Sequence, residues 1–294
     1  MAATTVKLQI ERRTGLTHSE FVNEYRNPIK PVILTDVSNK WKASKTFFLE
    51  YFKDNFGARE GKIAGKYYNL SEFIELLNNS TREEPALYPC ILKLHKDFAE
   101  FETEIEPKSP IKKHDRAGNS LLPRILVKGI SYLADLEVFL GGSGGEFPIL
   151  HYVLLGVNTF VNQLNGEKEF TFFTPDQQKY LYPKEESPHL SAIENHHNPD
   201  LTKYPLFANT TQTTVIISAG ESLFIPSGWY HTARSLTLTI SIQLDQLCQS
   251  NWEFFMNECC ITRRKSPLKA KMIYMYLASL GDLITARERL MGTR

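Results

Sequence analysis

Two histidines in β-prone segments are the side chains best suited to hold a metal ion. His151 lies in the run Leu150-His-Tyr-Val, and His231 ends the run Gly220-Glu-Ser-Leu-Phe-Ile-Pro-Ser-Gly-Trp-Tyr-His, 80 residues later. Imidazole nitrogens suit divalent transition metals, and a carboxylate two residues from a histidine on a strand would point to the same side. That position holds Val153, which cannot ligate a metal. His151 and His231 are therefore candidates to share a metal, and position 153 cannot supply a third ligand.

The chain from about residue 121 has the character of a β barrel. Short β-prone runs alternate there with turn signals such as Gly141-Gly-Ser-Gly-Gly145 and Asn165-Gly166, a pattern typical of all-β barrels and sandwiches. The clearest strand is predicted over residues 235–244, where apolar and polar residues alternate. Its apolar face would pack on a second layer, and its polar face, which carries Ser241 and Gln243, would line a cavity.

Helical patterns precede and follow the predicted barrel. Residues 44–56 carry aromatic side chains at helical spacing with Ser44 as a candidate cap, and residues 71–77 predict another helix capped by Ser71. Residues 78–120 are polar and proline-containing, so we expect loops there. Residues 252–258 and 268–291 predict two C-terminal helices. We expect a mixed helical lead-in over 1–120, the barrel over 121–247 and the C-terminal helices over 248–294.

Three segments together resemble the JmjC, or cupin-like, branch of the iron(II)- and 2-oxoglutarate-dependent oxygenases. They are residues 150–176, 197–207 and 220–231, which follow the order and spacing of that family. The layout is similar to that of the asparaginyl hydroxylase acting on hypoxia-inducible factor and of the jumonji lysyl hydroxylases. The resemblance implies a mainly β fold with flanking helices, in which a double-stranded β-helix forms a jelly-roll or cupin barrel.

The resemblance also implies cofactors and their contacts. Fe(II) would be held by His151 and His231, and 2-oxoglutarate would be converted to succinate and carbon dioxide while a C–H bond of the substrate is hydroxylated. Lys168 matches the family position that holds the distal carboxylate of 2-oxoglutarate. Further candidate contacts of the co-substrate are Thr159, Tyr132 and Gln243.

The sequence departs from the family pattern at two positions. Val153 replaces the metal-binding Asp, and Pro148 replaces a Thr that often contacts the co-substrate. A water or a carboxylate from elsewhere, such as Glu146, could complete the metal site. The alternatives to a hydroxylase are a catalytically impaired pseudo-oxygenase that acts as a binding module, and a halogenase-like site, which fits less well because valine is bulkier than the usual replacements.

The charge balance favours some partners over others. Lys+Arg number 34 against Asp+Glu 33, a net charge of +1, whereas nucleic-acid binders usually carry a basic excess. We therefore favour a protein side chain or a small molecule as the substrate. The chain start has no apolar secretory segment, no run approaches the ~20 apolar residues of a membrane span, and the four cysteines form no CxxC pair. We expect a cytoplasmic protein with no membrane partner.

Two further clusters have simpler interpretations. We expect His189, His196 and His197 to lie in a polar loop rather than to hold a second metal. The apolar and aromatic residues between 272 and 280 are more numerous than one helix face needs. They form either core packing or the surface of a homodimer, and the family resemblance adds weight to the dimer.

Overall fold

The computed structural model describes most of the chain. The described residues are 9–63, 66–93, 103–105, 115–117, 119, 121–122, 136–261 and 266–290. Tyr132 lies outside them, so its contact with a co-substrate stays a prediction. No helix in the described part of the chain is long and apolar enough to cross a membrane.

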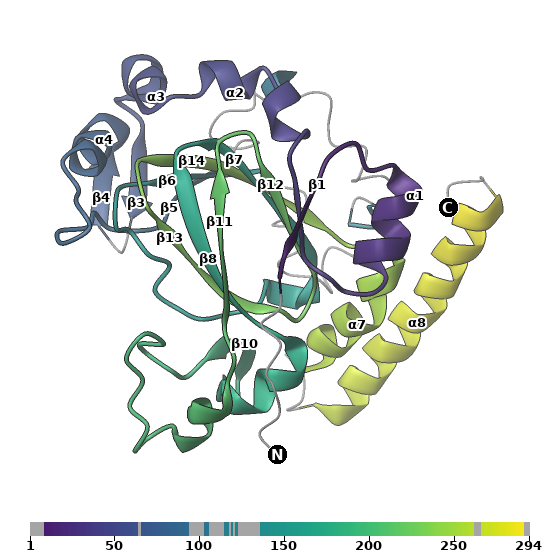
Figure 1. Cartoon of the computed structure of the whole chain (residues 1–294). Helices are drawn as coiled ribbons and strands as arrows, with labels where there is room; N and C mark the ends of the chain where they lie inside the picture. Colours follow the sequence, from purple (N-terminus) through teal and green to yellow (C-terminus); the bar gives the residue numbers. More distant parts are fainter. Residues whose placement is uncertain are drawn as a thin grey trace.

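Two β-sheets face each other and form the barrel (Figure 1). The larger sheet has the strand order β1-β2-β12-β7-β14-β6-β5, and the smaller sheet has the order β11-β8-β13. The strands of the larger sheet are β1 Glu11–Arg13, β2 Val32–Leu34, β5 Cys90–Lys93, β6 Glu137–Gly141, β7 Asn158–Asn165, β12 Ser222–Ile225 and β14 Thr239–Gln246. Those of the smaller sheet are β8 Glu167–Phe173, β11 Thr213–Ser218 and β13 Tyr230–Ser235. The predicted jelly-roll architecture with helices at both ends is confirmed.

Apolar side chains from both sheets meet inside the barrel. Val161 and Leu223 of the larger sheet pack in one cluster with Phe170 and Phe172 of the smaller sheet. A second cluster on the outer face of the larger sheet includes Phe160, which packs against the lead-in helices. Alternate residues of β7 therefore face opposite sides, as the two-residue period of a strand requires.

The strand predicted over 235–244 is two strands. The chain turns at residues 236–238, where it passes from β13 of the smaller sheet to β14 of the larger one. The backbone N–H of Leu236 and the hydroxyl of Thr237 both bond to Glu167, which fixes this corner. The alternation of residue types continues through the corner, so periodicity alone could not reveal it. From Thr239 onward the predicted faces are correct.

The lead-in is more closely joined to the barrel than the sequence indicated. Strands β1, β2 and β5 all precede residue 121 and join the larger sheet, so the region predicted as loops contains β5. The lead-in helices are α1 His18–Phe21, the π-helical turn η1 Val22–Arg26, η2 Ser38–Lys40, α2 Ala43–Thr46, α3 Leu49–Phe56 and α4 Leu70–Asn78. A hairpin of β3 Glu60–Ile63 and β4 Lys66–Asn69 separates α3 from α4.

The caps predicted at Ser44 and Ser71 are wrong. Ser44 lies inside α2, and its hydroxyl donates to the carbonyl of Trp41 at 2.7 Å. The α4 helix is capped by Asn69 instead of Ser71, because Asn69 has an extended backbone and its side chain accepts from the N–H of Glu72 at 2.8 Å. Glu72 in turn accepts from the N–H of Asn69, which completes a capping box.

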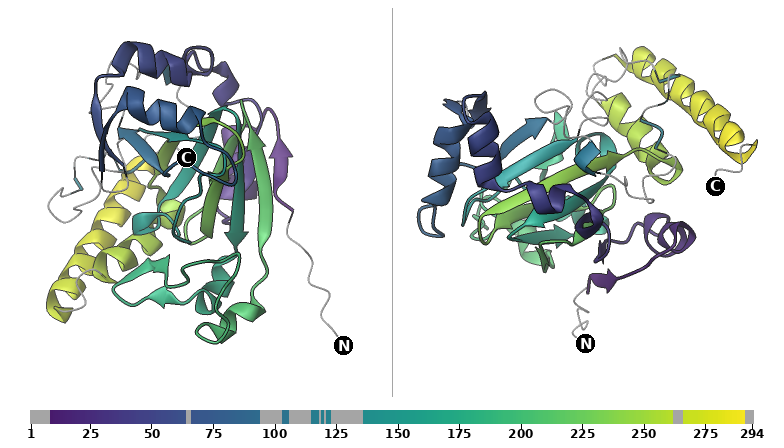
Figure 2. Two further views of the ribbon diagram at one scale, coloured as in Figure 1. Left: turned by 90° about the vertical axis from the view of Figure 1, so that its left-hand side faces the viewer. Right: turned by 90° about the horizontal axis from the view of Figure 1, so that it is seen from above.

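The two predicted C-terminal helices are present as α7 Trp252–Ile261 and α8 Pro267–Leu290. They pack on each other, and the indole N–H of Trp252 donates to the carbonyl of Leu277 at 3.1 Å. Figure 2 shows α8 in yellow along the outside of the molecule. Leu277 and Leu280 are buried, whereas Met272 and Met275 are exposed. The apolar stripe is thus partly core, and the homodimer stays a prediction for its exposed part.

Further short elements connect the barrel strands to one another or, in the case of η8, connect β14 to α7. They are η5 Leu154–Gly156, η6 Pro175–Tyr180, the hairpin of β9 Pro183–Lys184 and β10 Ser187–Ser191, η7 Pro205–Asn209 and η8 Gln249–Asn251.

Candidate metal centre

Backbone pairing brings the two predicted ligand histidines together. His151 forms an antiparallel bridge with His231 at the edge of the smaller sheet. The backbone N–H of each residue donates to the carbonyl of the other, at 3.1 and 2.7 Å. The ring centroids lie 4.7 Å apart. The long separation in the sequence is therefore closed by the sheet itself.

Hydrogen bonds hold both imidazole rings in the same tautomer. Nδ1 of His151 lies 2.8 Å from the carbonyl of Ile149, and Nδ1 of His231 lies 3.0 Å from the carbonyl of Trp229. Because a carbonyl can only accept, each Nδ1 carries the proton and each Nε2 presents a lone pair. Metal-binding histidines are commonly oriented in this way.

Both histidines are held in the neutral form. Burial and the nearby ring of His231 lower the pKa of His151 to about 3, and burial lowers the pKa of His231 to about 4. A neutral imidazole keeps its Nε2 lone pair at physiological pH, which metal ligation requires.

The two rings open into a cavity of about 330 Å³ inside the barrel. Its apolar walls include Phe139, Ile149 and Phe170. The ring of Phe147 stacks on the ring of His151 at 4.4 Å and so restrains its orientation. Of the residues predicted for the site, this cavity is lined by His151, Val153, Lys168, His231, Ser241 and Gln243.

Lys168 is a buried cation with neutral partners. Its side chain on β8 is 2% exposed, and its Nζ donates to the hydroxyls of Ser241 at 2.5 Å and Tyr88 at 3.2 Å. Burial lowers the pKa of Lys168 to about 7. Among the described residues no carboxylate forms an ion pair with it. A buried ammonium that forms no ion pair with a described carboxylate is well placed to receive the carboxylate of a ligand.

Thr159 and Gln243 occupy different positions relative to this cavity. Thr159 is on the interior face of β7, on the same side as Val161, and its buried hydroxyl has no hydrogen-bond partner in the structure. It is not among the residues that line the cavity directly. Gln243 does line the cavity, and its amide donates to the carboxylate of Asp245 at 3.0 Å.

Val153 lines the same cavity as the histidines, and Glu146, the carboxylate that the sequence suggested as a substitute ligand, does not line it. The side chain of Val153 lines the cavity and also packs against the apolar cluster of the C-terminal helices. Glu146 is not among the residues that line the cavity. Its carboxylate lies instead 2.9 Å from Nε2 of His197. The carboxylates that do line the cavity belong to Glu137 and Asp245.

Several site residues were missed by the sequence analysis. Tyr88 comes from the proline-containing region before the barrel, where no local pattern signals a contact with Lys168. His189 was assigned to a polar loop, but it lies on β10 and lines the cavity. Strand β10 reaches the site because Leu190, the residue after His189 on this strand, forms a backbone bridge with His151.

The other two histidines of that prediction form a separate cluster. His196 and His197 lie together with Glu146, and one ligand atom from each lies within 4.8 Å of the others. The ring of His196 is 3.9 Å from that of His197, and its pKa is lowered to about 4, chiefly by burial. The geometry of a second metal group, which the sequence analysis disfavoured, is therefore present at this surface.

Comparison with known proteins points to one family. A family model for the cupin-like domain matches residues 62–245, which include both cavity histidines and Lys168. The tRNA wybutosine-synthesizing protein 5 of Mus musculus is 32% identical over 267 residues, covering 86% of this chain and 80% of that protein. An arginine-specific and a lysine-specific demethylase of Arabidopsis thaliana are each 25% identical over 80% of this chain. The chain spans only 56% and 54% of the length of these two demethylases.

Proposed function

The chain belongs to the family of cupin-like JmjC domains, and we propose on that premise that it is an oxygenase dependent on Fe(II) and 2-oxoglutarate. The observation that carries the proposal is one cavity holding two histidines with available Nε2 atoms and a buried lysine. The histidines suit a divalent metal, and the lysine suits a carboxylate. A dicarboxylate with a keto-acid end could engage both.

The chain's own groups have distinct tasks in this proposal. His151 and His231 would hold the metal through Nε2, because their Nδ1 atoms are committed to backbone carbonyls. Lys168 would bind the distal carboxylate of 2-oxoglutarate, and its contact with Ser241 fixes the position of the ammonium group. Iron, when bound, supplies the activation of dioxygen by which 2-oxoglutarate and a substrate C–H bond are oxidised.

The cavity walls contribute by excluding water. Phe147, Ile149 and Phe170 surround the polar groups with apolar surface. An interaction between Lys168 and a carboxylate is stronger in this environment than in bulk water. A ligand in this cavity would be oriented by the metal and the lysine.

Val153 limits how well the residues fit an iron centre. Two neutral imidazoles bind a dication less strongly than two imidazoles and a carboxylate, because no ligand charge offsets that of the metal. This observation favours a second candidate function, a pseudo-oxygenase that binds 2-oxoglutarate or a substrate without turning it over. A halogenase-like site ranks lower, since the side chain of Val153 lines the cavity where chloride would bind.

The substrate is proposed at the level of chemical class. The near-neutral charge favours a protein side chain or a small molecule. The relative with 32% identity carries a name that refers to tRNA, and the two plant relatives carry names that refer to arginine and lysine demethylation. A substrate screen should therefore include tRNA beside arginine- and lysine-containing peptides.

The oxygenase proposal is tested by loading the full chain anaerobically with Fe(II) and titrating 2-oxoglutarate. We expect binding that depends on the metal, followed by succinate formation when air is admitted. Metal-dependent binding without succinate would select the pseudo-oxygenase. Absence of both metal and 2-oxoglutarate binding would contradict both functions.

A further inference from the structure

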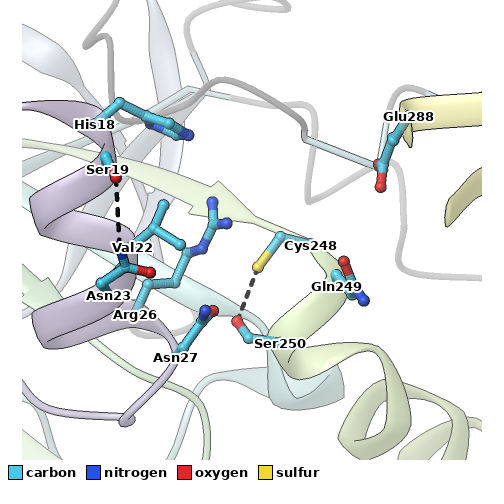
Figure 3. A pocket seen from close by; sticks show the side chains of 10 residues that line it. All are labelled: His18, Ser19, Val22, Asn23, Arg26, Asn27, Cys248, Gln249, Ser250 and Glu288. Atoms are coloured by element: carbon cyan, nitrogen blue, oxygen red, sulfur yellow. Dashed lines mark hydrogen bonds between the residues drawn. The ribbon is translucent and has the colours of Figure 1, made fainter. Parts of the chain in front are cut away.

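A second pocket, which we call the terminal pocket because its lining includes the last described turn of α8, lies away from the barrel cavity. It has a volume of about 640 Å³ and shares no lining residue with the cavity around His151. Its described lining comes from α1 and η1 on one side, and from η8 and the end of α8 on the other (Figure 3). The side chains are those of His18, Ser19, Val22, Asn23, Arg26, Asn27, Cys248, Gln249, Ser250 and Glu288.

Arg26 is the feature of this pocket that the fold does not explain. Its side chain extends from η1 toward Cys248 (Figure 3), and the residue is only 9% exposed. Its Nε and Nη1 atoms are buried without a hydrogen-bond partner. No carboxylate among the described residues forms an ion pair with it. A guanidinium group keeps its charge in proteins, so within the described part of the chain this buried cation has no anionic partner.

The carboxylate in the described lining does not neutralise Arg26. Glu288 accepts from Arg116, with Oε1 and Oε2 at 3.0 and 2.6 Å from two guanidinium nitrogens. Arg116 is itself buried, with a side chain 2% exposed. The negative charge of Glu288 is therefore matched by Arg116, and the positive charge of Arg26 remains.

Neutral donors surround this charge. Asn27 and Gln249 supply amide N–H groups at the exposed rim. Asn23 donates to Oγ of Ser19 at 3.3 Å, which leaves the hydroxyl hydrogen of Ser19 as a donor, and Oγ of Ser250 lies 3.2 Å from Sγ of Cys248 (Figure 3). A guanidinium group presents several donors in one plane, which matches the oxygens of a phosphate. A phosphate accepts more hydrogen bonds than a carboxylate does, and the pocket volume exceeds that of a single small ion.

We propose that this pocket binds the phosphate group of a small phosphorylated molecule, with Arg26 as the charged contact and the rim amides and hydroxyls as further donors. The proposal is independent of the chemistry in the barrel, because the two sites share no residue. The ligand could be inorganic phosphate or a phosphomonoester, since both offer the same anionic group to Arg26.

The test is a calorimetric and thermal-unfolding titration of the full chain without added metal. The probes are inorganic phosphate, adenosine 5′-monophosphate and adenosine. We expect phosphate and the monophosphate to bind and to raise the melting temperature, and adenosine to do neither. Tighter binding of the monophosphate would identify a phosphomonoester as the ligand class, and tighter binding of phosphate would identify the free ion.

Arg26→Met provides the decisive comparison, with the exposed Arg82→Met as its matched control. We expect Arg26→Met to lower phosphate affinity at least about tenfold. It should also raise the melting temperature of the phosphate-free protein, because an uncompensated buried charge is replaced by an apolar chain of similar length. Arg82→Met should change neither property. If Arg26→Met does not fold, Arg26→Gln, which keeps donors but removes the charge, supplies the same comparison.

Three results would overturn the proposal. The first is an unaltered melting temperature of the natural chain in both phosphate probes. The second is a phosphate affinity that is equal in the natural chain and in Arg26→Met, or that falls equally in Arg26→Met and Arg82→Met. The third is binding of a single-stranded RNA lacking terminal phosphates at Arg26 without binding of either small probe, which would assign the pocket to a polynucleotide backbone.

Discussion

Two buried basic side chains in this molecule, Lys168 and Arg26, differ in whether they can lose their proton when no anion is bound. Lys168 in the barrel has hydroxyl partners, and its pKa is lowered to about 7, so it can release its proton. Arg26 in the terminal pocket has neither a hydrogen-bond partner for Nε and Nη1 nor the chemistry to become neutral. The charge available to an anion therefore depends on pH in the barrel cavity, whereas in the terminal pocket it does not.

The largest expected effect is a loss of metal affinity on substitution of His231, with no change in the second region. His231→Ala removes one of two metal ligands and should lower metal affinity by more than the roughly 10–100-fold that loss of an outer-shell partner costs. Phosphate binding at Arg26 should be unchanged. Metal content by elemental analysis and a phosphate titration measure the two properties. His197→Ala is the companion variant, because His197 belongs to the other candidate metal group, with Glu146. Metal loss in His197→Ala without metal loss in His231→Ala would place the metal in that other group.

Lys168→Met tests the proposed role of the barrel cation. Loss of a charge partner from a partly buried carboxylate costs about 2–5 kcal/mol, so 2-oxoglutarate affinity should fall by about 30-fold or more. Lys179→Met, at an exposed position, should have little effect. The measurement is a calorimetric titration of the metal-loaded protein. Similar affinities for the two variants would show that Lys168 does not bind the co-substrate.

The comparison also predicts that ligand affinity depends on pH in the barrel cavity but not in the terminal pocket. Because a carboxylate binds the protonated lysine, 2-oxoglutarate affinity should fall by up to about tenfold per pH unit above about pH 7. Phosphate affinity at Arg26 should show no such loss in this range. Binding isotherms of both ligands, measured from about pH 6 to about pH 9, check both expectations. Lys168 changes from charged to neutral within roughly this range.

Stability without ligand should change with pH in the opposite direction. The pKa of Lys168 is lower in the folded chain, about 7 against 10.5, so the unfolded chain binds more protons between these values. The free energy of unfolding should therefore rise with pH in that window, by at most about 1.4 kcal/mol per unit from this group. Denaturant unfolding of the natural chain and Lys168→Met isolates the contribution. An identical slope in both chains would contradict the assignment.

Val153→Asp tests whether position 153 is the third ligand position of the metal in the barrel. A carboxylate at this position would offset one charge of the metal, and we expect Fe(II) affinity to rise on the order of tenfold, together with more succinate formed from 2-oxoglutarate. Val153→Asn is the control, because it has similar shape without the charge. If iron content and turnover are the same in all three chains, position 153 is not the third ligand position.

The smallest expected effect concerns Thr159. Its buried hydroxyl has no partner in the structure, so Thr159→Val removes an unsatisfied group and should stabilise the chain by about 1 kcal/mol. If the hydroxyl contacts 2-oxoglutarate, the same change should weaken binding by roughly fivefold. Unfolding and binding measured on one preparation distinguish these outcomes, and unchanged 2-oxoglutarate affinity would remove Thr159 from the co-substrate site.

Local sequence patterns determined the elements whose signals repeat over a few residues. The alternation after Thr239 places Ser241 and Gln243 on the cavity face, and the C-terminal helices lie where apolar spacing predicted them. Family motifs identified His151, His231 and Lys168 as a set. The same local signals failed at the corner after β13 and at the caps Ser44 and Ser71, because a corner or a cap is set by backbone geometry that residue types alone leave open.

Tertiary structure decided which distant residues share a site. Tyr88 reaches Lys168, and β10 brings His189 to the cavity, although neither has a sequence signal that links it to the metal motifs. The terminal pocket is the clearest case, since Arg26 and Cys248 line it together although they lie far apart in the sequence. Sequence type fixes the charge of Arg26, but its burial without an anion is a property of that packing, because desolvation depends on every element that surrounds the side chain.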